Sequence, residues 1–364
     1  MTAANQRKQA LPSQFLLEAQ HYTHPSWVPI EQTHIFQKVW MYVGDARRLS
    51  PGQVWATAVA GQPVVITCEA ANKYRAFRNV CPHRAALLCP NQGVSAAKHL
   101  VCPYHAWVYD YQGNLVGTPS KERLPENFNP RHYALSPVRV ASWCDFLFVC
   151  FAQNAPDLET FLNPIPTHIS SHRRSSTKLL FRQSRSVACN WKVYHDNTLC
   201  DYHVAIAHRT TLNKLQGPVK AYRHQFWQYT NLLYTPTLAS WRTSNAVLPE
   251  LSTFAQDNFL TYGIFPNLHL LALPNGLLAW IRIDPVAVDR SEVVLEVYGP
   301  PEMLAKREAI QTEFNSFIAE DEALVESVQI GYASGAYVPG PVSQLEHRIV
   351  QQQQLILSHL IPAR

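Results

Sequence analysis

The sequence has no run that approaches the ~20 consecutive apolar residues of a membrane-spanning helix. Its N-terminus lacks a basic segment followed by an apolar one, so a secretory signal is not evident. Lysine and arginine form no long tract, and the densest group, Arg173, Arg174 and Lys178, is typical of a solvated surface. These absences predict a cytoplasmic protein that binds neither a membrane nor nucleic acid.

Charged residues make up only 16% of the 364 residues, hydrophobic residues make up 47%, and the formal net charge is a mild +5. This composition is typical of a globular protein with one large domain or two modest ones. The chain has no Gly-x-Gly-x-x-Gly fingerprint for NAD or flavin, so electrons for redox chemistry must come from another protein. It has no internal repeat, and its one low-complexity segment, residues 351–354, is predicted to be an exposed helical turn.

Two short motifs carry most of the functional information. Residues 81–84 read Cys-Pro-His-Arg, and residues 102–105 read Cys-Pro-Tyr-His. Two thiolates and two imidazoles on paired loops suit a Rieske [2Fe–2S] cluster, in which cysteines hold one iron and histidines hold the other. A structural zinc site is the alternative, but zinc motifs usually keep the two cysteines together and the two histidines together. The predicted cluster ligands are Cys81, His83, Cys102 and His105.

The other six cysteines do not indicate a disulfide framework. Several lie in apolar, strand-like runs such as residues 146–150, where a reduced thiol behaves as a small hydrophobic group. These six residues are Cys68, Cys89, Cys144, Cys150, Cys189 and Cys200.

The similarity to a known family extends beyond the four ligands. Arg84 follows the first histidine, Trp107 follows the second pair of ligands, and Gly113 and Pro119 lie where a third loop would close. With these residues the segment resembles the Rieske domain of the Rieske non-heme iron oxygenases. The resemblance continues from residues 35–40 to the C-terminal helix and implies a catalytic α subunit, similar to the choline and carnitine monooxygenase branch.

The hydrophobic pattern divides the chain into three parts. Residues 1–45 look helical, and residues 46–155 show short β-rich runs cut by Gly and Pro. The third part, residues 156–364, begins within a linker near 154–166. The predicted fold class is α+β, and the resemblance implies an all-β Rieske domain (46–155) inserted into a helix-over-antiparallel-sheet, or helix-grip, oxygenase domain. Predicted strands are 54–59, 63–67, 146–151, 176–188, 224–236, 261–273, 277–284 and 292–299, and predicted helices are 190–208, 302–329 and 345–360.

A second metal site is predicted within residues 190–208. His203 and His208 are five residues apart, and they can converge if the helix distorts or ends between them. Two histidines and one carboxylate form the facial triad of non-heme Fe(II) oxygenases, which leaves positions open for dioxygen and substrate. A purely structural role is the alternative for a histidine pair on an apolar helix. The resemblance favours a mononuclear Fe(II) site and assigns Asn197 to the catalytic centre.

The third iron ligand must be acidic and distant in sequence. Residues 320–329 resemble the late helix of the family, whose aspartate corresponds to Asp321. Glu320 and Glu322 are the alternatives, and an exposed acidic helix face is the structural interpretation of this segment.

One departure concerns the acid that links the two metal sites in the family. The resemblance places that carboxylate three residues before the first iron histidine, where this chain has Cys200. The nearest acid, Asp201, is displaced by one residue, which rotates a side chain by ~100° on a regular helix. Asp201 is the predicted catalytic bridge, and Asp196 is the second candidate.

The resemblance implies that a separate reductase or ferredoxin delivers electrons to the cluster, which passes them to an iron that activates O2. The predicted reaction is monooxygenation of a small organic substrate, which can end in demethylation, and cis-dihydroxylation of an aromatic ring is the alternative. An aromatic cage for a quaternary amine would suit Phe226, Trp227, Tyr229 or Trp241. The resemblance also implies a homo-oligomer with a trimeric ring, and it leaves open whether the assembly is a trimer or a hexamer. A non-catalytic Rieske electron carrier is the alternative from another class, and it would leave His203, His208 and Asp321 unused.

Overall fold

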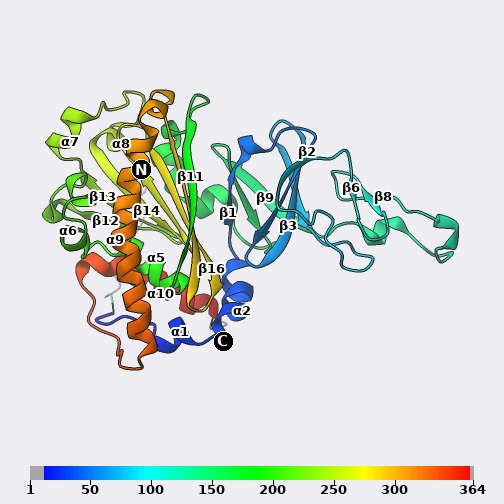
Figure 1. Ribbon diagram of the computed structural model, residues 1–364, viewed down its shortest axis with the longest axis horizontal. Coiled ribbons are helices and arrows are strands. Elements are labelled where there is room, and N and C mark those ends of the chain that lie inside the picture. Colours follow the sequence, from blue (N-terminus) through cyan, green and yellow to red (C-terminus); the bar gives the residue numbers. More distant parts are fainter. Residues whose placement is uncertain (1–11, 361–364) are drawn as a thin grey trace, which may run out of the picture. The chain divides into compact units, whose positions relative to one another are not determined.

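The computed structural model describes residues 12–360. They form two compact units, a smaller one of residues Gln32–Thr160 and a larger one that combines the described residues up to Glu31 with those from Phe161 onward (Figure 1). The smaller unit is therefore inserted in sequence into the larger one. The domain boundaries near 45 and 155 that the sequence suggests stay predictions.

The smaller unit is built almost entirely of antiparallel strands. A seven-stranded sheet has the order β1-β10-β9-β4-β3-β2-β5, and a separate three-stranded sheet has the order β6-β7-β8. Its strands are β1 (Met41–Asp45), β2 (Gln53–Val59), β3 (Gln62–Ala70), β4 (Lys73–Arg78), β5 (Gly93–Ala96), β6 (Leu100–Val101), β7 (Val108–Tyr109), β8 (Leu115–Gly117), β9 (Pro137–Trp143) and β10 (Phe146–Cys150). A hydrophobic core that contains Cys81 and Cys102 joins the two sheets.

One glycine fixes the turn that follows β7. Gly113 has a φ of +83°, and a Cβ atom there would lie 2.4 Å from Cε1 of Phe77. Only glycine fits this close approach of backbone to ring. The carbonyl of Gly113 accepts a hydrogen bond of 2.8 Å from the amide of Leu135, which ties the turn to the following segment.

The larger unit has a seven-stranded antiparallel sheet of the order β11-β17-β16-β15-β14-β13-β12. The long helix α9 (Arg307–Ala333), drawn in orange, runs across this sheet, and α5 (Trp191–Leu199) packs against both α9 and the strands β15 and β16 (Figure 1). The strands are β11 (Lys178–Val187), β12 (Arg223–Phe226), β13 (Thr230–Pro236), β14 (Asn258–Ile264), β15 (Leu268–Ala272), β16 (Leu278–Ala287) and β17 (Arg290–Gly299). The remaining α-helices are α1 (Ala19–Thr23), α2 (Trp27–Glu31), α3 (Leu158–Leu162), α4 (Ile165–Ile169), α6 (Val204–Ala207), α7 (Ala239–Ser244), α8 (Thr253–Asp257) and α10 (His347–Leu360).

The position of α5 is fixed at both of its ends. Asn190 caps its first turn by accepting a hydrogen bond from the amide of Lys192. At the other end, a Cβ on Gly263 of β14 would lie 2.3 Å from Cδ2 of Leu199. The glycine therefore lets the end of α5 lie directly on the sheet.

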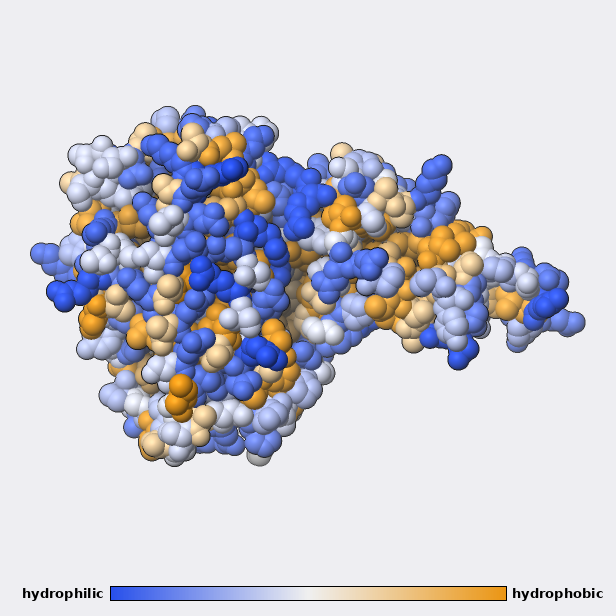
Figure 2. Space-filling model, in the orientation of Figure 1, coloured by the Kyte–Doolittle hydropathy of each residue, from blue (hydrophilic) through white to orange (hydrophobic). Residues whose placement is uncertain are grey.

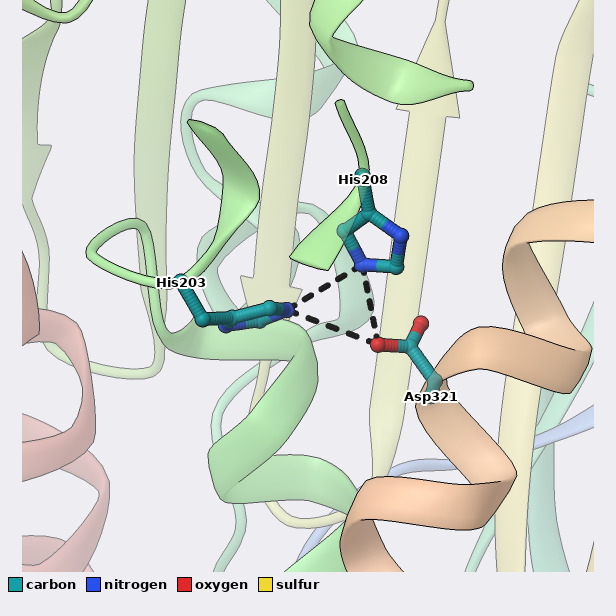
Figure 3. Close-up of side chains that lie close together, drawn as sticks. All are labelled: His203, His208 and Asp321. Atoms are coloured by element: carbon teal, nitrogen blue, oxygen red, sulfur yellow. Dashed lines mark hydrogen bonds and ion pairs between the residues drawn. The ribbon is translucent and has the colours of Figure 1, made fainter. Parts of the chain in front are cut away.

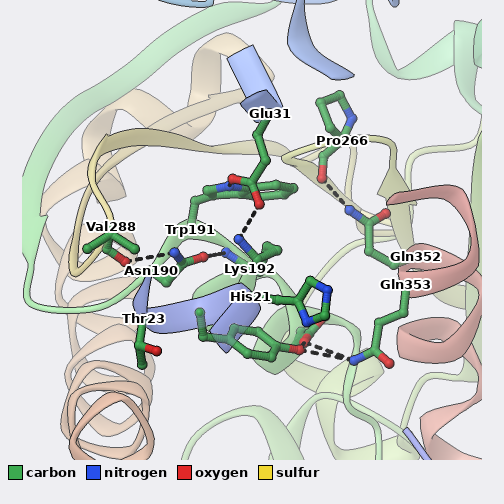
Figure 4. A network of polar contacts seen from close by, with 12 residues as sticks. His21, Thr23, Glu31, Asn190, Trp191, Lys192, Pro266, Val288, Gln352 and Gln353 are labelled. Carbon is green, nitrogen blue, oxygen red and sulfur yellow. Dashed lines mark hydrogen bonds and ion pairs between the residues drawn. The ribbon is translucent and has the colours of Figure 1, made fainter. Parts of the chain in front are cut away.

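A buried polar network connects α5 to the N-terminal helices (Figure 4). Lys192 is fully buried, and its Nζ lies 2.5 Å from Oε1 of Glu31. The indole of Trp191 donates a hydrogen bond of 2.7 Å to the other oxygen of the same carboxylate. A buried charge is costly unless it is paired, so Glu31 needs both partners.

Several predicted elements need correction. The segment 41–45 is strand β1 and not helix, because it pairs with β10 at the edge of the seven-stranded sheet. The predicted strands 224–236 and 261–273 are each a hairpin of two strands, and the predicted linker 154–166 contains α3. The predicted helix 190–208 is interrupted between α5 and α6. The part of the predicted N-terminal helix in residues 1–11 lies outside the described residues.

The glutamine run is the clearest error in predicted exposure. Gln352 and Gln353 are buried, with exposed fractions of 3% and 1%. The amide of Gln352 donates to the carbonyl of Pro266, and that of Gln353 donates to the hydroxyl of Tyr22 at 3.1 Å (Figure 4). The amides stay buried because the surrounding chain supplies their hydrogen-bond partners.

Among the described residues, no helix is long and apolar enough to cross a membrane. On the face of the molecule in Figure 2, hydrophobic residues form small patches among hydrophilic ones.

Candidate metal centres

The helix interruption after Leu199 creates the first candidate site. His203 is the N-cap of α6 and His208 is its C-cap, so the short helix holds the two imidazoles at its ends. The Nε2 atoms of the two rings lie 3.2 Å apart (Figure 3). Asp321 on α9 places its Oδ1 3.4 Å from Nε2 of His203 and 3.0 Å from Nε2 of His208. One potential ligand atom from each residue lies within 4.8 Å of the other two.

The three side chains form a strongly polarised cluster. Burial alone would raise the pKa of Asp321, but hydrogen bonds with His203 and His208 outweigh it and lower this pKa to about 2. Burial would lower the pKa of His203, but the hydrogen bond with Asp321 and the neighbouring Cys200 side chain outweigh it and raise this pKa to about 10. A cation is therefore favoured at the point where the three groups meet, and a divalent metal can take the place of the protons.

Neighbouring side chains orient two of the three groups, His208 and Asp321. Nδ1 of His208 lies 2.6 Å from Oε2 of Glu320, which also accepts a hydrogen bond of 2.7 Å from Thr211. A carboxylate on Nδ1 leaves Nε2 free for a metal, which is the usual arrangement around ligating histidines. Nδ2 of Asn197 donates a hydrogen bond of 2.7 Å to Oδ1 of Asp321.

The alternative acids have other partners. Glu320 contacts the far side of the His208 ring, and Glu322 pairs with Arg185 at 3.2 Å. Of the three neighbouring acids, Asp321 is therefore the one that joins both histidines.

The acid next to Cys200 belongs to a different network. Asp201 is buried, and its carboxylate lies 3.1 Å from Nη1 of Arg348 and 2.8 Å from Nε2 of His224. The second candidate for a bridge, Asp196, accepts a hydrogen bond of 2.9 Å from Tyr22. Burial raises the pKa of Asp196 to about 7.

The second candidate site consists of two loops with the same backbone pattern. In one loop the amide of Ala85 donates to the carbonyl of Cys81, and in the other the amide of Ala106 donates to that of Cys102, both at 2.9 Å. Each cysteine amide in turn donates at 2.8 Å to the carbonyl five residues further along the chain. Ala85 and Ala106 both have positive φ, near +59° and +53°, so the two loops fold alike.

The donor set of these loops fits a Rieske cluster. Cys81 and Cys102 are buried, and the rings of His83 and His105 lie 4.5 Å apart between centroids. Nδ1 of His105 is buried with no hydrogen-bond partner, as expected of an atom that needs a metal. Burial raises the pKa of the Cys81 thiol, so metal binding is what would release its proton. The ring of Trp107 stacks on His83 at 4.6 Å and orients it.

A cavity of ≈ 970 Å³ in the larger unit meets the pocket that holds the three convergent residues. The two spaces share four lining residues, Leu212, Phe259, Leu271 and Phe317. The further apolar lining of the cavity includes Trp241, Leu248, Leu273, Leu277, Ile310 and Phe314. Its charged residues, which are exposed, are Lys214, Glu302, Lys306 and Glu313. This volume suits an organic ligand with a mainly apolar body.

Two family models match the chain in the regions of these two sites. The Rieske [2Fe–2S] domain matches residues 39–129. The ring hydroxylating alpha subunit (catalytic domain) matches residues 168–360, more than half of the 364 residues. The chain belongs to this family. It is a Rieske non-heme iron oxygenase α subunit, so the family resemblance and the α+β fold class are confirmed.

Known relatives of this oxygenase include monooxygenases. Choline monooxygenase of Spinacia oleracea is 27% identical over 88% of this chain and 72% of its own length. The carnitine monooxygenase oxygenase subunit of Acinetobacter baumannii is 27% identical over 90% of this chain and 86% of its own. The quaternary ammonium Rieske monooxygenase CntA, solved with γ-butyrobetaine, is 26% identical, covers 96% of both chains and has a TM-score of 0.78. Naphthalene 1,2-dioxygenase, at 21% identity and a TM-score of 0.72, shares the fold.

The oxygenase is therefore an enzyme that uses a Rieske cluster and a mononuclear iron, and the electron-carrier alternative is wrong. Sequence analysis missed Glu320 as the partner of His208, although it named that residue as a rival ligand. It also missed His224 and Arg348, because no motif marks residues that meet Asp201 from distant strands and helices.

Proposed function

We propose that His203, His208 and Asp321 hold the mononuclear iron of this Rieske oxygenase. The observation that supports this most directly is that their ligand atoms converge within 4.8 Å in a pocket that adjoins a larger, mainly apolar cavity. When bound there, a ferrous ion supplies the activation of O2. We likewise assign the Rieske cluster to Cys81, His83, Cys102 and His105.

The surrounding side chains orient the ligands and exclude water. Glu320 holds His208 in the tautomer that presents Nε2, and Asn197 holds one oxygen of Asp321, which we infer to be its contribution to catalysis. Phe259 and Phe317 lie where the cavity meets the metal pocket, so a bound substrate would displace water from the reacting centre.

We further propose that the reaction is monooxygenation of a small organic substrate, which can end in demethylation. The names of the relatives support this, since they are a choline monooxygenase and a carnitine monooxygenase oxygenase subunit. Of the predicted cage aromatics, Trp241 lines the cavity, whereas Phe226, Trp227 and Tyr229 do not line it or the metal pocket. Cis-dihydroxylation of an aromatic ring is the second candidate, because the wide apolar cavity also suits a flat ring.

The electron donor is a separate reductase or ferredoxin, as the family requires. We propose a homo-trimer in which a neighbouring chain's cluster serves each iron, in keeping with the inter-subunit electron transfer described for CntA. A bridging role for Asp201 or Asp196 stays a prediction. A cytoplasmic location is also a proposal, supported by the six cysteines outside the cluster, which form no disulfide in the described structure.

Metal analysis and single substitutions test the iron site. The native protein should contain iron and acid-labile sulfide at about 3:2 and show a Rieske EPR signal after reduction. His203→Ala, His208→Ala and Asp321→Ala should each lower this ratio to about 1:1 and leave the EPR signal unchanged. Glu322→Ala is the matched control and should keep the third iron. Loss of iron in that control, with retention in Asp321→Ala, would refute the ligand assignment. For the reaction itself, 18O2 incorporation separates the insertion of one oxygen atom from two.

A further inference from the structure

One histidine near the proposed iron site has no role so far. His269 lies on β15 and is 4% exposed. It lines the same pocket as His203, His208 and Asp321. Nδ1 of His269 is buried and has no hydrogen-bond partner in the described structure.

The sheet explains why this imidazole faces the metal pocket. Side chains alternate along a strand, so His269 and Leu271 share the face that lines the pocket. On the neighbouring strands, His269 is paired with Gly263 of β14 and Ile281 of β16. Gly263 has no side chain and Ile281 is apolar, so neither pairing residue offers the ring a hydrogen bond.

The other polar side chains around the pocket already have partners. Apart from the three proposed ligands and the thiol of Cys200, five such side chains line it. Asn197 bonds to Asp321, and Thr198 bonds to the carbonyl of His195. Asp201 and Thr261 both bond to Arg348, and Gln216 bonds to Tyr222. Of these five side chains and His269, only His269 has a buried polar atom without a partner.

The imidazole is held in its neutral form. Burial, together with the nearby Arg348 and His195, lowers the pKa of His269 well below its ordinary value. A neutral imidazole carries one donor and one acceptor nitrogen, so it can bond to a hydroxyl, carbonyl, carboxylate or N–H group. A buried polar atom without a partner costs about as much as a lost hydrogen bond, which a ligand would recover.

We propose that His269 is a positioning residue that receives a polar atom of the substrate and so places the reacting carbon at the iron. This inference rests on the proposed function and adds a substrate class to it. The substrate is then a mainly apolar molecule that occupies part of the ≈ 970 Å³ cavity, reaches the metal pocket and carries a hydrogen-bonding group close to the carbon that is oxidised.

Indole and indene are a matched pair of probes, because they share one bicyclic shape and differ by an N–H group. Equilibrium binding of each to the holoenzyme, by calorimetry in the absence of a reductase, isolates the hydrogen bond from turnover. The native protein should bind indole about 3- to 10-fold more tightly than indene. His269→Leu should bring this ratio to about one with little change for indene, and His269→Gln should restore part of it.

An indole preference that persists in His269→Leu would overturn the assignment, and so would the failure of both probes to bind at their solubility limits. Iron content, sulfide content and the Rieske EPR signal of the same preparations keep this result separate from the proposed function. If the native protein lacks the third iron, the proposed function fails, whereas the ratio of probe affinities still reports on His269.

Discussion

The ion pair between Asp201 and Arg348 gives a prediction that separates a structural role from an electron-transfer role. Arg348 is 1% exposed and donates hydrogen bonds of 2.8 Å to Asn231, 3.1 Å to Asp201 and 3.3 Å to Thr261. Asp201 is the carboxylate that compensates its charge in the described structure. Asp201→Asn leaves a buried guanidinium without a counter-charge, which should cost about 3–5 kcal/mol.

A loss of that size should lower the unfolding temperature by roughly 10 °C, measurable by scanning calorimetry. Combining Asp201→Asn with Arg348→Met removes both charges and should recover much of the lost stability. If Asp201→Asn alone were as stable as the native protein, the pair would not be a buried structural ion pair.

The same Asp201→Asn variant tests the predicted bridge. If Asp201 also links the two metal sites, single-turnover oxidation of the reduced cluster should slow strongly while both metals stay bound. Cys200→Asp is the comparison that restores an acid at the family's position.

Three further predictions follow from individual contacts. Glu320→Gln should weaken iron binding about 10- to 100-fold in a chelator titration, because His208 loses the carboxylate that orients it, and an unchanged affinity would argue against this role. Burial raises the pKa of Asp196 from 3.8 to about 7, so between these pH values the folded state keeps a proton that the unfolded chain releases. The free energy of unfolding should therefore fall by up to about 4 kcal/mol as the pH rises from 3.8 to about 7. Asp196→Asn should remove that slope from thermal unfolding curves recorded from about pH 4 to about pH 8. Gly263→Ala should destabilise the protein by about 1–3 kcal/mol in urea titrations and weaken iron binding, because the added Cβ would meet Leu199. Unchanged stability and iron affinity would mean that α5 shifts without cost.

The sequence predicted the parts of the molecule that short motifs and regular patterns describe. The two Cys/His motifs mark loops that the structure folds alike. The spacing of His203 and His208 suggested that they converge if the helix distorts or ends between them, whereas the break falls before His203, at the end of α5, and α6 lies between the two histidines. The hairpin turn at 265–267 was missed because the apolar character of 261–273 continues through it. Contacts between distant segments have no such pattern. The pairing of Asp201 with Arg348, 147 residues away, depends on how α10 packs against the rest of the unit.

Helix α9 supplies both the proposed ligand Asp321 and part of the cavity wall. Phe317, Phe314 and Ile310 precede Asp321 at helical spacing and line the cavity from the same helix face. A substitution that reshapes this wall therefore acts within a few turns of the metal and risks moving it. Another part of the wall, residues 244–249 from the end of α7 onward, carries no proposed ligand. New substrate ranges should consequently evolve more readily through residues 244–249, and a mutant library for altered selectivity is best confined to that part of the wall.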